Sequence, residues 1–395
     1  MSFDLVVAGG SFAGLVLATS ARGRVALIEK GEVGEGQTSA CATTLDAIEK
    51  LGLEAATEAV HDTAVFHHRR GAVRFRLPYR LCTFDYRTFC RLLLERFDGE
   101  LIGAAATGVR APASGRAVVC TTRGDVEAGA VVDATGWRAV LACSADPWFP
   151  ATAARSYGLE QAAYPGDPAP PTAPGPREHH TGPDASGFRD NVQESGVTGR
   201  GEGGLRFHFS PHVHGAGYGW AFPAGPVTRA GLLSYLAADG VRDATVRFLA
   251  AEQIAGTGWH GGYLPAGLRP PLAGPVFTLG DAAGHCLPLT AEGIRPAIYF
   301  AQRLAALLDR EREGATRADT RAAWRALHAG HRRGYAVLHA LQGGLRGWPD
   351  PPLGALFRWY AKEGGLYRWV GRSYWRLSAP IIPAPFGAHL AEASA

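Results

Sequence analysis

An apolar strand followed at once by closely spaced glycines is the feature that most constrains the fold of this chain. Residues 3–8 (FDLVVA) lead directly into residues 9–14 (GGSFAG), and a helical run follows to residue 21. In a strand–turn–helix unit of this kind, Gly9 permits the tight turn, Gly10 lets the backbone approach a pyrophosphate, and Gly14 lets the helix sit close to the strand. The N–H groups at the helix start can then bind phosphates.

The second strand supports a dinucleotide. It covers residues 24–28 and ends in Glu29, twenty residues after Gly9, where a carboxylate can accept both hydroxyls of an adenosine ribose. In the usual G-x-G-x-x-G spacing the middle glycine would fall at Ser11, so the fingerprint is incomplete. Strand, helix, second strand and acid together still favour dinucleotide binding over an ordinary helix-capping turn. The binding residues expected here are Gly9, Gly10, Ser11, Phe12, Ala13, Gly14, Glu29 and Lys30.

A second signature lies far along the chain, at residues 280–294 (GDAAGHCLPLTAEGI). An apolar strand at 276–279 precedes it, and a helix is expected from about residue 291 to 308. An Asp just after a strand can bind a ribityl hydroxyl, and the helix start can direct N–H groups at the pyrimidine edge of a flavin. A nicotinamide enzyme needs no such remote second clamp, so the two signatures predict FAD. The further contact residues are Gly280, Asp281, Pro288, Gly293 and Ile294.

Two more segments complete a family resemblance. With residues 83–94 (TFDYRTFCRLLL) and 131–136 (VVDATG), the signatures resemble the geranylgeranyl reductase branch of the FAD-dependent para-hydroxybenzoate hydroxylase superfamily. The resemblance spans most of the chain. It implies an α/β fold, with a Rossmann-type FAD-binding domain of the glutathione reductase-like, para-hydroxybenzoate hydroxylase type and an inserted, mainly β substrate domain. It also implies that Arg87 reaches the phosphate and ribose region of FAD.

The reductase branch in particular is indicated by residues 217–223 (GYGWAFP), which are similar to its Y-x-W-x-F-P motif, and by the loop around Cys41, which resembles its cysteine-bearing loop beside the flavin. Cys41 is therefore a candidate proton donor, with an ordered water as the alternative. Two departures leave the reaction open. Thr135 interrupts the Asp-Gly motif of the hydroxylases, and Ala42 and Thr43 replace the glycines that follow the cysteine in the reductases.

The order of these segments suggests three regions. The FAD-binding domain is expected at 1–62, 81–144 and 263–320, the substrate domain at 63–80 and 145–262, and a C-terminal helical region at 321–395. Residues 63–78 read as two short strands of the inserted sheet. The stretch 164–204 contains seven prolines and no periodicity, and is either a surface excursion or a lid over the substrate site.

The substrate side of the site is expected to be apolar. Tyr218, Trp220 and Phe222 alternate along a strand, so they share one face, either as core packing or as the wall of a substrate channel. His208, His212 and His214 have no carboxylate or cysteine at ligand spacing, and no metal is expected. The C-terminal region interleaves aromatic residues with arginines, which suits a membrane surface or the mouth of a site for a lipophilic substrate.

Composition and the absence of certain sequence patterns exclude several classes of protein. The net charge is only +4, and no block of basic residues interleaved with aromatics lies where nucleic acid would be expected to bind. There is no secretory signal pattern and no 18-residue apolar run, so a cytoplasmic protein is expected, with membrane contact limited to the surface. The six cysteines form no C-x-x-C pair.

The expected function is reduction of carbon–carbon double bonds in a hydrophobic small molecule, of isoprenoid, polyene or polyketide type, by reduced FAD. The alternatives are an FAD-dependent monooxygenase of natural-product tailoring and a non-redox flavoprotein cyclase. Halogenation is disfavoured, because none of the three lysines, Lys30, Lys50 and Lys362, is placed for the channel between flavin and substrate. No second nucleotide motif is visible, so the electron donor is expected to be transiently docked NAD(P)H or a partner such as a flavin reductase or ferredoxin.

Overall fold

A computed structural model describes most of the chain. The described residues are 2–69, 71–111, 116–150, 153–165, 204–209, 217–236, 240–265, 267–345, 350–362 and 365–377. Nearly all of the proline-rich stretch 164–204 and residues 212 and 214 lie outside these ranges, so the two interpretations of that stretch stay open. Within the described ranges, no helix combines the length and apolar character that crossing a bilayer requires.

The first sheet holds the two glycine signatures. Its order is β15-β16-β9-β1-β2-β6, with β7 and β8 added as a hairpin beside β9. The central neighbours β16, β9, β1, β2 and β6 are all parallel, so their carboxyl ends meet at one edge. The strands are β1 (Ser2–Ala8), β2 (Val25–Glu29), β6 (Glu100–Gly103), β7 (Ala106–Arg110), β8 (Ala117–Thr121), β9 (Gly124–Asp133), β15 (Leu272–Ala273) and β16 (Val276–Thr278).

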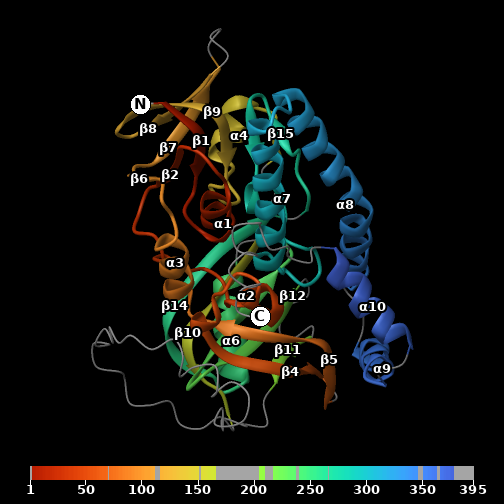
Figure 1. Cartoon of the computed structure of the whole chain (residues 1–395). Helices are drawn as coiled ribbons and strands as arrows, with labels where there is room; N and C mark the ends of the chain where they lie inside the picture. Colours follow the sequence, from red (N-terminus) through yellow and green to blue (C-terminus); the bar gives the residue numbers. More distant parts are fainter. Residues whose placement is uncertain are drawn as a thin grey trace, which may run out of the picture.

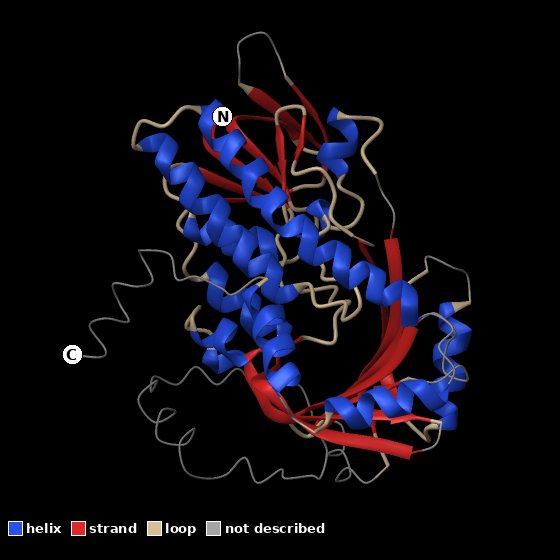
Figure 2. Cartoon of the chain, turned by 90° about the vertical axis from the view of Figure 1, so that its right-hand side faces the viewer, coloured by secondary structure: helices blue, strands red, loops and turns tan. Residues whose placement is uncertain are grey.

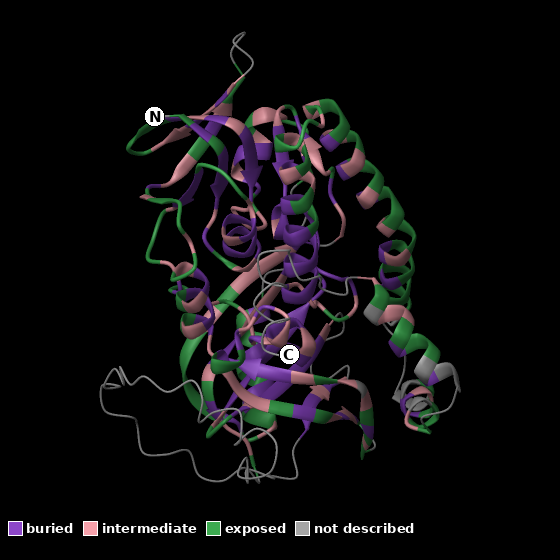
Figure 3. Cartoon of the chain, in the orientation of Figure 1, coloured by how far each residue is buried: buried purple, intermediate pink, exposed green. Residues whose placement is uncertain are grey.

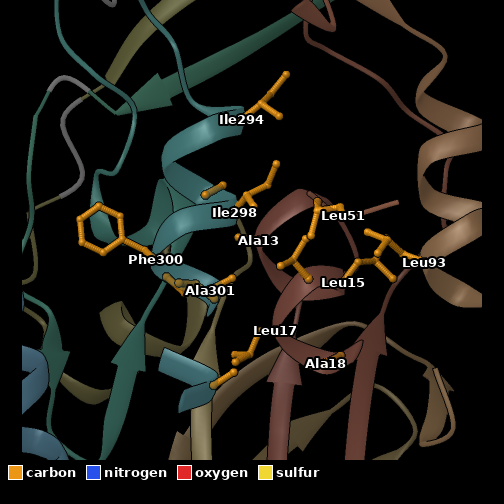
Figure 4. Close-up of a cluster of buried hydrophobic side chains, with 14 of the residues drawn as sticks. Ala13, Leu15, Leu17, Ala18, Leu51, Leu93, Ile294, Ile298, Phe300 and Ala301 are labelled. Carbon is orange, nitrogen blue, oxygen red and sulfur yellow. The ribbon is translucent and has the colours of Figure 1, made fainter. Parts of the chain in front are cut away.

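Helices bury one face of this sheet. Helix α1 (Phe12–Ser20) packs beside α7 (Ile294–Arg312), with α3 (Tyr86–Leu94) on its other side. Figure 4 shows Leu15 between Ile298 on one side and Leu93 on the other. Seven of the nine residues of α1 are buried, because the helix is enclosed between the sheet and two helices. The opposite face is covered by the β7–β8 hairpin and by α4 (Val140–Ala145).

The second sheet is long and curled, in the order β14-β10-β13-β12-β11-β4-β5-β3 (Figures 1 and 2). Short helices α2 (Leu45–Glu49) and η1 (Glu54–Ala56) lead into it, and α6 (Val241–Ala251) packs on β10 and β13. Its strands are β3 (Ala42–Thr44), β4 (Thr57–His68), β5 (Gly71–Phe84), β10 (Ala153–Ala163), β11 (Leu205–His208), β12 (Gly217–Ala224), β13 (Val227–Ser234) and β14 (Ala255–Pro265).

Three helices complete the described fold. Helix α8 (Arg317–Leu345) packs along α7, while α9 (Asp350–Tyr360) lies against β4 and β5 and α10 (Gly365–Arg376) against β5 (Figure 1). The predicted fold class is confirmed: a parallel α/β layer, a second β sheet inserted into it, and C-terminal helices. The exact domain limits stay predictions, although β4 already begins at Thr57 and β5 runs on to Phe84. The sequence did not indicate β6, β7, β10, β13 or β14.

Candidate functional site

One large cavity joins the two sheets. It encloses about 1250 Å³, which is above the range of roughly 300–1,000 Å³ usual for a small-molecule pocket. The two glycine signatures line one part of it. Aromatic and aliphatic side chains from the second sheet and the C-terminal helices line the other part. The cavity therefore has room for a dinucleotide and a second molecule next to it.

The first glycine turn is packed so closely at Gly9 and Gly14 that neither position could carry a side chain. Gly9 has φ of +109°, and a Cβ added there would lie 2.2 Å from the carbonyl oxygen of Ala134 at the end of β9. A Cβ on Gly14 would lie 1.8 Å from the carbonyl oxygen of Gly9. The turn is therefore enclosed between β9 and α1, and its backbone faces the cavity through Gly10 and Ser11.

Glu29 lies beside this turn, at the cavity wall. Its carboxylate accepts hydrogen bonds from the backbone N–H groups of Gly10 at 2.6 Å, Lys30 at 2.9 Å and Gly31 at 3.2 Å. A Cβ on Gly10 would come within 3.2 Å of the Glu29 side chain, so the close approach of the two depends on glycine. Three N–H donors hold the carboxylate at the carboxyl end of β2, where it can also accept ligand hydroxyls.

The second signature meets the first in space. Gly280 begins the 3-10 helix η2 (Gly280–Ala283) with φ of +62°, and a Cβ there would lie 2.8 Å from Cβ of Ala13 in α1. Asp281, the next residue, lines the cavity. Burial raises the pKa of this carboxyl group to about 6, and the nearby Arg269 opposes the shift. Arg269 itself donates to the carbonyl oxygens of Trp137 at 2.6 Å and Asp281 at 3.2 Å.

The loop between η2 and α7 adopts a strained backbone. Leu289 and Ala291 have φ of +73° and +53°, values that are uncommon for residues other than glycine. Two tyrosines, one in β12 and one directly after β13, hold this conformation. The hydroxyl of Tyr218 donates to the carbonyl oxygen of Thr290 at 2.6 Å, and that of Tyr235 donates to Leu289 at 2.7 Å. The second sheet thus fixes the loop that faces the expected flavin position.

Helix α8 holds the same loop from behind. Nδ1 of His285 accepts from the N–H of Gly280 at 3.1 Å, and its Nε2 lies 3.1 Å from Nε2 of His328. The hydroxyl of Tyr335 donates to the carbonyl oxygen of His285 at 2.5 Å. Burial lowers the pKa of His285 well below its usual range and that of His328 to about 3. Both rings are therefore neutral near pH 7, and His285 donates to His328.

A buried ion pair marks the start of α7. The guanidinium of Arg295 is bidentate to Glu292, at 2.6 and 2.8 Å, and its side chain has no exposed surface. The hydroxyl of Tyr374 in α10 donates to the Glu292 carboxylate at 2.6 Å and lies 2.5 Å from Oγ1 of Thr290. Glu292, Thr290 and Tyr374 all line the cavity. Helix α10 is therefore joined directly to this loop.

The other part of the cavity is an aromatic chamber. Tyr218, Trp220 and Phe222, which alternate along β12, are all buried and all line it. Five phenylalanines from β4, β5, β11 with the residue after it, and α9 extend the wall: Phe66, Phe75, Phe207, Phe209 and Phe357. Edge-to-face contacts such as Phe66–Phe75 at 4.7 Å pack these rings together. Binding of substrate by the β12 residues stays a prediction.

Several expected residues lie outside the cavity wall. Cys41 is completely buried in the core beneath the α1 layer, and burial raises the pKa of its thiol. Its neighbours Ala40 and Ala42 line the cavity and Cys41 does not, and a role for Cys41 as a proton donor stays a prediction. Gly14 packs against the turn, and Pro288 lines a small separate void behind the loop. Arg87 is exposed and pairs with Glu35 at 2.8 Å, and its contact with FAD stays a prediction.

Other residues of the site were not expected from the sequence. The Tyr86 hydroxyl donates to Oγ of Ser11 at 3.0 Å and ties the first turn to α3. The rings of Trp137 and Tyr263 pack in a tilted arrangement with centroids 4.6 Å apart, and both residues line the cavity. Tyr86 directly precedes Arg87 in the quoted motif, which could have indicated it. Nothing in the sequence connects Trp137 with Tyr263, because they lie far apart along the chain.

In the described part of the chain, no group of three His, Cys, Asp or Glu side chains is placed to hold a metal ion.

Comparisons with known proteins bear on the fold. No protein-family model matches the sequence, and no curated protein matches it. A geranylgeranyl bacteriochlorophyll reductase-like protein from Thermoplasma acidophilum superposes with a TM-score of 0.71 at 14% identity, covering 97% of this chain and 93% of that one. The flavin-dependent brominase Bmp2 gives a TM-score of 0.69 at 14% identity, with coverage of 100% and 99%.

A third structure of this kind is p-nitrophenol 4-monooxygenase from Pseudomonas putida. Its TM-score is 0.68 at 14% identity, with 95% of this chain and 98% of that chain covered. Three proteins named for different reactions thus share the architecture over nearly their whole length. The chain has the mixed α/β fold of para-hydroxybenzoate hydroxylase-type flavoproteins, with a curled β sheet and C-terminal helices.

Proposed function

We propose that the chain is an FAD-dependent oxidoreductase that acts on a hydrophobic small molecule. The observation that carries the proposal is the single cavity in which both glycine signatures and the aromatic chamber meet. Fold alone does not define a reaction, so the argument rests on this site. A dinucleotide needs a glycine-lined backbone cradle and a hydroxyl acceptor, and an apolar substrate needs a dry wall next to it.

The residues present fit FAD. Gly136 lines the cavity with φ of +81°, and a Cβ there would meet no atom within 4 Å, so it would occupy open cavity space. At the ribose position, Glu29 supplies a carboxylate next to Gly10. Asp281, which lines the same cavity, supplies a second hydroxyl acceptor. A glycine turn and two carboxylates on one cavity wall are the kinds of group that bind the phosphates and hydroxyls of FAD.

When bound, FAD supplies hydride transfer to the substrate or, after reduction, reaction with O2. The chain's own residues supply position and electrostatics. The start of α7 presents the positive end of a 19-residue helix and favours negative charge on a ligand beside Gly293 and Ile294. Tyr218 and Tyr235 hold the loop that precedes this helix. The phenylalanine-rich wall offers an apolar surface to a substrate in the second half of the cavity.

Within this class we favour reduction of carbon–carbon double bonds in an isoprenoid, polyene or polyketide-like molecule. The resemblance of the sequence motifs and the likeness to the Thermoplasma acidophilum protein support this choice. Monooxygenation is the first alternative, because the fold is shared with a protein named as a monooxygenase, and a non-redox flavoprotein cyclase is the second. An ordered water is our candidate for the proton donor of the reductive reaction, with NAD(P)H, a flavin reductase or ferredoxin as electron source.

Product mass distinguishes the three reactions. The FAD-loaded protein would be reduced with dithionite without oxygen and mixed with geranylgeraniol, with and without later addition of air. Reduction gives a product heavier by two hydrogens without air. Monooxygenation requires air and adds one oxygen atom per O2 consumed, and cyclisation leaves the mass unchanged. A protein that neither contains FAD after purification nor binds added FAD would refute the proposal as a whole.

Asp281 gives the FAD site a testable pH dependence. A ligand hydroxyl that donates to the carboxylate stabilises its ionised form, so the pKa of about 6 falls when FAD binds. FAD affinity should therefore be constant above pH 6 and weaken as pH falls below it, approaching about tenfold per pH unit. Flavin fluorescence titrations from pH 5 to 7.5 measure this. Asp281→Asn should bind more weakly at pH 7 and lose the pH dependence. Equal pH profiles for the two proteins would refute the assignment.

The raised pKa of Asp281 also affects the stability of the FAD-free protein. The pKa of Asp281 is higher in the folded state than the ordinary value of 3.8, so ionisation of this group destabilises the fold as pH rises from about 4 to about 6. Asp281→Asn should therefore be more stable than the FAD-free wild type at pH 7, as measured by urea unfolding, although it binds FAD less tightly. Higher stability together with weaker FAD binding would show that Asp281→Asn loses a ligand contact and does not unfold the protein.

A further inference from the structure

The solvent-exposed surface of α8, α9 and α10 combines apolar side chains with positive charge. We name it the basic face. Its exposed hydrophobic residues are Val337, Leu341, Trp359, Trp369 and Val370, each between 37% and 61% exposed. They make up five of the eleven large hydrophobic residues that are exposed in the described part of the chain. In Figure 3, exposed residues (green) alternate with buried and intermediate ones along α8 and occur again on α9 and α10.

The charge of this region differs in sign from that of the rest of the chain. Residues 322–377 contain nine basic residues and two acidic ones, a net charge of +7 within a total of +4, so the remaining chain carries −3. On α10, Trp369, Arg372 and Arg376 recur at helical spacing, and all three are exposed. An aromatic and cationic helix face of this kind matches the anionic surface of a phospholipid bilayer.

The inward face of the same helices is separately fixed. Phe357 of α9 packs on Phe66 at 4.7 Å, and Tyr367 of α10 packs on Phe75 at 6.4 Å. The hydroxyl of Tyr367 also donates to the carbonyl oxygen of Arg76. These buried aromatic residues attach the helices to the second sheet. The outward tryptophans and arginines are therefore not needed to hold the helices in place.

The basic face is continuous with the cavity. Leu341, Trp359 and Val370 are exposed to solvent and also line the cavity, so they belong to its rim. Tyr374, on the inner side of α10, lines the same cavity and contacts the loop at Glu292. The rim residues and the aromatic chamber therefore belong to one and the same cavity.

We propose that the basic face docks on an anionic bilayer and that the hydrophobic substrate enters the chamber directly from the lipid. The route of the substrate rests on the proposed function, whereas docking on the bilayer does not. Transfer through a rim pressed against lipid avoids exposing a large apolar molecule to water. The tryptophans would lie at the headgroup level, and the arginines would bind lipid phosphates.

The test uses the full-length protein and vesicles of phosphatidylcholine, with or without phosphatidylglycerol. We expect co-sedimentation with the anionic vesicles, little with phosphatidylcholine alone, and a decrease when salt is added. The double variant Arg372→Glu, Arg376→Glu should lose about 30-fold or more in partitioning. Arg123→Glu, Arg247→Glu is the matched control: it changes the net charge equally at two exposed positions on other surfaces, and should bind as the wild type does.

Tryptophan fluorescence tests which surface of the protein faces the bilayer. Lipids brominated on their acyl chains should quench the wild type, and Trp359→Phe, Trp369→Phe should lose most of this quenching while still co-sedimenting. Absence of binding to anionic vesicles, or equal loss in the control variant, would overturn the proposal. Concentration-dependent self-association that Arg372→Glu, Arg376→Glu abolishes, without vesicle binding, would assign the face to contacts between copies instead. FAD content, measured in the same samples, reports separately on the proposed function.

Discussion

Replacement of Glu292 by alanine is expected to destabilise the protein by about 3–5 kcal/mol. The substitution removes the bidentate partner of the fully buried Arg295 guanidinium, and it removes one of the two hydrogen-bond partners of the Tyr374 hydroxyl. Removing one member of a buried ion pair is among the most destabilising changes in a folded protein. Urea unfolding of the FAD-free protein measures the loss, so the result does not depend on the proposed reaction.

Two further variants test whether burial of the Arg295–Glu292 ion pair causes the loss of stability. Glu292→Gln combined with Arg295→Met removes both charges and should recover most of the lost stability. Glu95→Ala breaks the i,i+4 pair of Arg91 and Glu95 on α3, where both side chains are more than half exposed, and should cost less than about 0.5 kcal/mol. If Glu292→Ala lowers the free energy of unfolding no more than Glu95→Ala does, Arg295 is not buried as described.

Replacement of Gly14 by alanine is expected to destabilise the protein by about 3 kcal/mol and to abolish FAD retention. The added Cβ would lie 1.8 Å from the carbonyl oxygen of Gly9, so α1 must move away from β1 and displace the turn. A backbone atom cannot rotate aside as a side chain can. Because the same turn carries Gly10 at the cavity wall, stability and FAD affinity should fall together.

A glycine in open space provides the control. Gly330 lies within α8, and a Cβ there would meet no atom within 4 Å. Gly330→Ala should therefore stabilise the protein by about 0.5–1 kcal/mol through helix propensity and leave FAD binding unchanged. Unfolding midpoints and the ratio of bound flavin to protein are the measurements. A stable, FAD-retaining Gly14→Ala protein would contradict the close contact of α1 with the first turn.

Features that depend on local backbone geometry were predictable from the sequence. The alternation of apolar strand, glycine turn and helix marks β1 and α1, because only glycine fits between the Ala134 carbonyl and the helix. The same reasoning indicated β16 and the loop before α7. The regular alternation of Tyr218, Trp220 and Phe222 indicated a shared strand face, and the structure gives that face to the cavity.

Contacts between residues distant in the sequence were not predictable in this way. The loop before α7 depends on His328, Tyr335 and Tyr374, which follow it by 43 to 84 residues and have no spacing that connects them with it. The resemblance that suggested Cys41 gave a loop but not the depth of one side chain. Whether a thiol faces a cavity or the core depends on how neighbouring elements pack, and here they bury it.

The sequence by itself therefore indicated the strand–turn–helix units, because these rest on short-range backbone requirements that leave a mark in neighbouring residues. It indicated the fold class through the family resemblance that those units and the other motifs carry. Only the tertiary structure decided which side chains face the cavity, how its loop is held, and that the basic helices form its rim. Burial and pairing are set by the packing of elements from distant parts of the chain, and no local pattern encodes that packing.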